Sequence, residues 1–145
     1  MFFGKNKKND ENEDLIKVAA LLIHAAKIDE DYSFGIYALG SGTDVTVSTS
    51  GNVTSNGRGI AAFNDGTGKI SITTSGTVTS LNSYGINAYS FATSSPTDVT
   101  VEANAVNGKS DGISAVNNGT GSTTVTANGT IRGGVGQTDQ TTDAD

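Results

Sequence analysis

Apolar and polar residues alternate along most of the chain from Phe34 onward, and the alternation recurs as a repeat. The motif Gly-Ile-x-Ala begins at Gly35, Gly59, Gly85 and Gly112, so the repeats are 24 to 27 residues long. Self-similarity with a period of about 20–50 residues is typical of solenoids and arrays. The hydrophobic pattern therefore predicts a stack of similar structural units.

Each repeat contains three short strand signals. The first is Gly-Ile-x-Ala with an apolar residue after it, the second alternates with a period of two, and the third is a β-branched residue after a turn of small residues. Such alternation predicts half-buried strands rather than helices. The first set is Ile36, Ala38, Leu39, Ile60, Ala62, Phe63, Ile86, Ala88, Tyr89, Ile113, Ala115 and Val116. The second set is Val45, Val47, Ile70, Ile72, Val99, Val101, Thr123 and Val125, and the third is Val53, Val78, Val106 and Ile131.

These signals predict a mainly β fold over residues 34–134, a short parallel β-helix (solenoid) of about four coils. Equivalent strands of successive coils would pair in parallel at a spacing of about 4.8 Å, with the Val and Ile side chains stacked inward. One coil buries too few apolar side chains to offset the conformational entropy of ordering its backbone, so several coils have to stack.

Residues 1–33 follow a different pattern, with a charged beginning and then an apolar stretch from Leu15 to Ile28. Asp14 is a suitable N-cap. Only Lys17, His24 and Lys27 interrupt the apolar surface, so we expect one N-terminal α-helix that requires burial on several sides.

The same stretch is too short and too charged to cross a bilayer. The acidic residues before it do not fit a signal peptide. At the other end, the polar residues 135–145 are expected to form a disordered tail.

The segment LIKVAALLIHAAKIDEDYS resembles the opening helix and loop of TerB-like domains, which occur in tellurite-resistance proteins and some co-chaperones. Ala25, Ala26, Lys27, Asp29 and Ser33 carry the resemblance, which ends at Phe34. It implies a cytoplasmic stress-linked protein as one alternative. It also implies Asp29 and Asp31 as candidate metal ligands, because acidic residues of this loop are thought to bind metal in some members.

The repeat region resembles the passenger regions of autotransporters and related bacterial adhesins. The pattern is carried by Gly59-Ile60-Ala61-Ala62, Ile70-Ser71-Ile72 and Ser75-Gly76-Thr77-Val78. The resemblance implies a non-enzymatic, secreted or cell-surface module that binds a host-cell or matrix surface, a glycan or another protein. With two unlike segments, the chain would be a fragment or a chimera of the two designs.

The net charge of −6 disfavours nucleic acid and anionic membranes as partners. The chain has no cysteine and a single histidine, His24, so it offers no Cys/His or Ser/His/Asp constellation and no His-based zinc site. We expect no cofactor.

Asp44, Lys69 and Asp98 occupy one repeat position and would form a ladder of alternating charge. The ladder could fix the register of the coils. Alternatively, Asp44 and Asp98 could act as an acid/base pair, since some β-helix enzymes that act on polysaccharides use aspartates on the outside of one sheet.

Two outward columns of hydroxyl side chains are expected on the second strand of each repeat. Regular hydroxyl arrays occur in ice-binding solenoids, and threonine is also a good outward strand residue. Uncapped end coils would allow end-to-end self-association. The columns are Thr46, Ser71, Thr100 and Thr124, and Ser48, Thr73 and Thr126, the second interrupted by Glu102.

Overall fold

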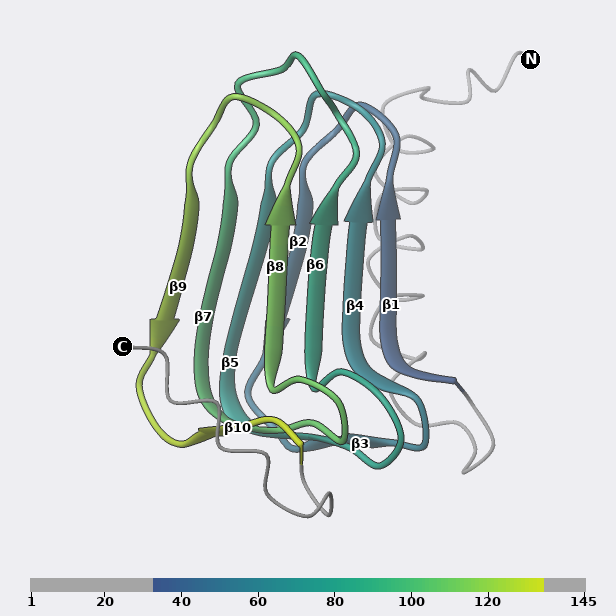
Figure 1. Ribbon diagram of the computed structural model, residues 1–145, viewed down its shortest axis with the longest axis vertical. Helices are drawn as coiled ribbons and strands as arrows, with labels where there is room; N and C mark the ends of the chain where they lie inside the picture. The colour runs from purple at the N-terminus through teal and green to yellow at the C-terminus, as the bar shows by residue number, and fades with distance from the viewer. Residues whose placement is uncertain (1–32, 135–145) are drawn as a thin grey trace, which may run out of the picture.

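The computed structural model describes residues 33–134, which form ten β-strands and no α-helix. The prediction of a mainly β, parallel solenoid of about four coils is confirmed (Figure 1). The expected helix over residues 15–28 and the expected tail over residues 135–145 lie outside the described residues. Within those residues no helix is long and apolar enough to span a membrane.

Two parallel sheets form the walls of the solenoid. Sheet A contains β1 (Phe34–Gly40), β4 (Arg58–Asn64), β6 (Ile86–Ser90) and β8 (Ile113–Asn117). Sheet B contains β2 (Val45–Thr49), β3 (Val53–Ser55), β5 (Ile70–Ser80), β7 (Val99–Asn107), β9 (Thr123–Ala127) and β10 (Ile131–Arg132). Figure 1 shows β8, β6, β4 and β1 side by side, with β9 and β7 running in the opposite direction on the other wall.

The core consists of inward columns that run from coil to coil. Ile36, Ile60, Ile86 and Ile113 are paired in register across sheet A, and the two middle isoleucines are fully buried. The third-strand column from Val53 to Ile131 is in register as well. These alignments match the columns that the repeat predicts, because side chains two residues apart in a strand share one face.

The second and third strands of the two middle coils are continuous, which the strand signals did not indicate. β5 spans eleven residues and β7 nine. The register between them shifts from Thr74 to Thr77, so β5 has an extra residue at this corner. A β-bulge lets a strand bend without leaving its ladder, so the corner needs no separate turn.

Asparagine side chains stabilise the corners between sheet A and sheet B. Asn64 is fully buried, and its Nδ2 donates to the Thr43 carbonyl of the preceding coil at 2.7 Å. Its Oδ1 accepts from the Gly66 backbone N–H at 2.8 Å. Asn117 makes the same two contacts two coils later, with Thr97 and Gly119. The inward polar side chain is thus satisfied by two backbone groups.

Replacing Asn64 with alanine is expected to lower the free energy of unfolding by about 1–3 kcal/mol, because it leaves the Thr43 carbonyl and the Gly66 N–H without these partners. Urea unfolding of the full chain measures the change. Asn82→Ala is the control, because Asn82 is exposed. An equal effect of the two substitutions would contradict the role given to Asn64.

Candidate binding surface

The predicted charge ladder lies at the starts of β2, β5 and β7. The Asp44 carboxylate accepts a hydrogen bond from the Lys69 backbone N–H at 2.8 Å, and Asp98 accepts one from the Ser122 backbone N–H at 2.9 Å. Lys69 Nζ lies 3.4 Å from the Asp98 carboxylate. Both carboxylates therefore bond to the backbone of the next coil, a geometry that suits a role in fixing the register.

A pH dependence follows from this arrangement. The hydrogen bond from the Ser122 N–H, followed by that from Lys69, holds the pKa of Asp98 below its ordinary value. The Asp98 carboxyl therefore binds its proton less tightly in the folded state than in the unfolded chain. As a result, the ionised carboxylate stabilises the fold at pH values above the unfolded pKa of about 3.9. This stabilisation is lost as the pH falls through the lower folded pKa.

We expect Asp98→Asn to reduce stability at neutral pH and to matter progressively less below about pH 4. Urea unfolding of the wild type and the variant, at pH values from about 2 to about 7, measures the difference in their free energies of unfolding. Asp111→Asn removes the same charge from an exposed turn and serves as the control. A wild-type advantage that stays constant down to the lowest pH would contradict this linkage.

The register places the predicted hydroxyl residues in two rows on the outside of sheet B. Thr46, Ser71, Thr100 and Thr124 are paired in succession, as are Ser48, Thr73, Glu102 and Thr126. Most of these side chains are exposed and Ser71 is half-buried. Glu102 also accepts a hydrogen bond from Asn128 Nδ2 at 3.0 Å, so the second row is not a uniform hydroxyl array.

The candidate metal ligands Asp29 and Asp31 lie outside the described residues. Among residues 33–134, no group of three or more His, Cys, Asp or Glu side chains is arranged to hold a metal ion.

The outer face of sheet A differs from that of sheet B because one of its outward rows is apolar in all four coils. Leu39, Phe63, Tyr89 and Val116 follow the inward alanines and are paired in register from coil to coil. Leu39 remains 61% exposed, and Tyr37, two residues earlier on β1, remains 49% exposed. Sheet A thus presents one apolar outward row, which sheet B lacks, and a second, mixed row of Tyr37, Ala61, Asn87 and Ser114.

Five aromatic side chains on this face form a row of touching rings, here called the ring row. The successive centroid distances are 4.9, 5.6, 6.2 and 4.5 Å, and each pair of rings is tilted by between 44° and 61°. Aromatic pairs favour such separations and tilted orientations. In spatial order the ring row is Phe34, Tyr37, Phe63, Phe91 and Tyr89.

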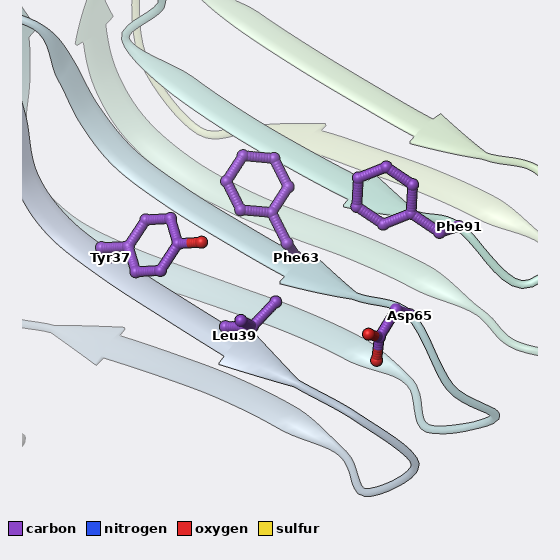
Figure 2. Close-up of a pocket in the computed structure, with 5 residues that line it drawn as sticks. All are labelled: Tyr37, Leu39, Phe63, Asp65 and Phe91. Carbon is purple, nitrogen blue, oxygen red and sulfur yellow. The ribbon is translucent and has the colours of Figure 1, made fainter.

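The ring row borders a hollow of about 460 Å³, here called the ring hollow, which is lined by Tyr37, Leu39, Phe63, Asp65 and Phe91. Figure 2 shows the three rings in an arc, with Leu39 and Asp65 on the opposite side. Asp65 supplies the charged side chain of the lining, directly after the end of β4. The ring hollow is therefore an open, mainly apolar site with one carboxylate at its rim.

Arg58 lies at the start of β4, near Phe34, which is the first ring of the ring row. Its guanidinium carbon is 5.4 Å from the Phe34 ring centroid, 5.8 Å from that of Phe63 and 5.7 Å from that of Tyr84. Its Nε is buried without a hydrogen-bond partner. The rings of this face are thus placed where they attract a cation.

The ring hollow is not among the sites predicted from the sequence. The alternation of inward and outward side chains along each strand could have indicated part of it. If the isoleucine and alanine of Gly-Ile-x-Ala point inward, the apolar residue after the alanine points outward. Phe91 lies just beyond the end of β6, so strand parity alone does not place it.

The described part of the chain is a parallel β-solenoid with an apolar, ring-lined hollow on one wall and a mostly hydroxyl-bearing second wall. No family model matches the chain, and comparisons with curated proteins and with solved structures found no match. The resemblances to TerB-like domains and to autotransporter passengers rest on the sequence motifs quoted above.

Proposed function

We propose that the chain is a non-enzymatic β-solenoid module of a bacterial surface or secreted protein, of the autotransporter-passenger or adhesin type, and that it binds its partner at the ring hollow. The observation that carries the proposal is the exposure of Tyr37, Leu39 and Phe91, which are 49%, 61% and 49% exposed around one hollow.

Contiguous exposed apolar surface is uncommon on soluble proteins and marks sites that bind other molecules. The molecule supplies its own comparison, because sheet B has the same coil geometry and carries Thr46 and Thr100 at exposed outward positions. Apolar outward side chains are therefore not a requirement of the solenoid. They are best explained by a binding role for sheet A.

The architecture supports a display function. The ladder hydrogen bonds and inward columns link successive coils, so three side chains of the ring hollow are carried on neighbouring strands, and Asp65 and Phe91 directly follow the ends of strands. Tyr37 and Leu39 belong to β1 and Phe63 to β4, which are paired in register. Sites built on regular elements hold their geometry well. The resemblance of the repeat to autotransporter passengers supports an extracellular or cell-surface location.

Retention of protein-coated beads tests the proposed function. Beads that carry the wild-type chain are expected to bind mucin-coated or fibronectin-coated glass, and Leu39→Asp or Phe91→Ser is expected to abolish retention. Leu81→Ser is the matched control, because Leu81 is 52% exposed and does not line the ring hollow. Equal retention of all the coated beads, or no retention by the wild type, would overturn the proposal.

The open end of the fourth coil favours self-association as a second property. β8 is the last strand of sheet A among the described residues, and β9 is exposed along its length, with Val125 48% exposed. Neither strand contains a charged residue or a proline, the features that usually block pairing at sheet edges. We expect a concentration-dependent dimer in light scattering that Val125→Lys removes, and a monomer at every concentration would contradict it.

A further inference from the structure

We infer that the ring hollow binds an organic cation, specifically a trimethylammonium group of the choline kind carried by a soluble molecule. This inference rests on the proposed function, because it names the ligand of the same surface. Its basis is the combination of aromatic rings, a carboxylate at the rim and the charge of the neighbouring turns.

The rings suit a rounded cation better than a flat sugar. The Tyr37 and Phe63 rings are tilted by 53° and the Phe63 and Phe91 rings by 44°. A sugar ring stacks face to face on an aromatic plane, so an extended saccharide platform needs rings that share a plane. A trimethylammonium group is nearly spherical and attracts ring faces from several directions.

The charge around the ring hollow complements a cation. The Asp65 carboxylate lies in the lining. The turns that lead from sheet A to sheet B contain Asp44, Asp65 and Asp98 against one basic residue, Lys69, which pairs with Asp98, so the net charge of these turns is negative. This rim attracts a cationic ligand and repels the phosphate layer of a lipid bilayer, which is why a soluble carrier is favoured over a lipid head group.

The ring row already binds one cation within the chain. The Arg58 guanidinium lies within 5.4–5.8 Å of Phe34, Phe63 and Tyr84, inside the range of cation–π attraction. Arg58 begins β4 and Asp65 directly follows its end, so a ligand cation beside Asp65 lies at the other end of that strand. The hollow of about 460 Å³ has the size of small-molecule sites and can hold the ammonium group with part of its carrier.

The experiment compares choline with 3,3-dimethylbutan-1-ol, which has the same shape but no charge. Both are titrated into the full-length chain at constant ionic strength, and the signals of Tyr37, Phe63 and Phe91 are followed by NMR. We expect choline to shift these signals with an affinity several times that of the neutral alcohol. Asp65→Asn and Tyr37→Leu are each expected to weaken choline binding about 2–5-fold. Asp65→Asn should leave binding of the alcohol unchanged.

Asp111→Asn is the control for the loss of one negative charge, and it should not alter the titration. Equal affinities for choline and the alcohol would overturn the inference, as would tighter binding of chitotriose at the same residues. If choline causes no shifts at Tyr37 and Phe91, the inference is wrong and the hollow is covered. If the shifts depend on protein concentration alone, the inference is wrong and a second copy of the chain occupies the hollow. Sedimentation with phosphatidylcholine vesicles without binding of free choline would overturn the soluble carrier.

The inference and the proposed function fail separately. If Phe91→Ser abolishes bead retention while choline does not bind, the cation ligand is wrong and the binding surface stands. If Phe91→Ser leaves retention unchanged, the proposed function is wrong whatever choline does.

Discussion

Replacing Ile86 with alanine is expected to lower the free energy of unfolding by about 2–5 kcal/mol. Ile86 is fully buried and is paired in register with Ile60 on one side and Ile113 on the other. The lost methyl groups would leave a cavity between strands of adjacent coils. The ladder hydrogen bonds keep these strands apart, so the cavity cannot collapse easily. Ile86→Val, which removes less volume, should cost about 0.5–1.5 kcal/mol.

Urea unfolding of the full chain, followed by circular dichroism, measures both variants. Leu81→Ala removes a similar volume from a side chain that is 52% exposed, and it should change stability by less than about 0.5 kcal/mol. If Ile86→Ala were no more damaging than Leu81→Ala, the inward isoleucine column would be wrong.

Gly85→Ala is expected to destabilise the fold by about 3 kcal/mol, the upper end of the usual range for overpacking. A Cβ built at Gly85 overlaps Val106 Cγ1 and lies 2.6 Å from the Gly112 carbonyl oxygen. The same overlap with the next coil's carbonyl and the third-strand valine occurs at Gly59. The glycine of Gly-Ile-x-Ala is therefore required by the close approach of neighbouring coils. Gly51→Ala is the matched control, because its added Cβ meets nothing within 4 Å.

A double-mutant cycle separates this steric cause from a general effect of the substitution. Val106→Ala removes the methyl group that the new Cβ would strike. The double variant should then be less destabilised than the sum of the two single variants, because neighbouring residues that share a contact are not additive. Strict additivity would mean that the contact with Val106 does not limit the site.

The stacking of the coils could be predicted because the same pattern of strand signals recurs in four repeats. Side chains two residues apart in a strand share a face, and equivalent positions of successive repeats pair in parallel. Ile60 and Ile86 could therefore be aligned without a structure, and so could the outward row that contains Thr46 and Ser71. Their measured register agrees with this alignment.

The corners could not be predicted because polar side chains there point inward. Asn64 and Ser90 are fully buried at positions where the alternation indicates an inward residue but hydrophobicity does not. Their burial depends on specific partners, namely two backbone groups for Asn64 and the Thr97 hydroxyl for Ser90. Such partners become visible only when the turn geometry is known.

The ring hollow could be predicted only in part. Leu39 and Phe63 stand at outward positions of paired strands, so their adjacency follows from the register. Phe91 and Asp65 come from turns of different coils, and the paths of those turns bring them to the same hollow. Local turn geometry, which the repeat does not encode, completes the site.

The stacked solenoid is defined by the order of its coils, and methyl-selective NMR of the folded full chain tests that order. Isoleucine methyl labelling should give strong nuclear Overhauser contacts between Ile60 and Ile86 and between Ile86 and Ile113, which are neighbours in register. Ile60 and Ile113 lie two strand spacings apart, about 9.6 Å, and should give no direct contact of comparable strength. A strong contact between Ile60 and Ile113, or none from Ile86 to either, would contradict the stacked solenoid.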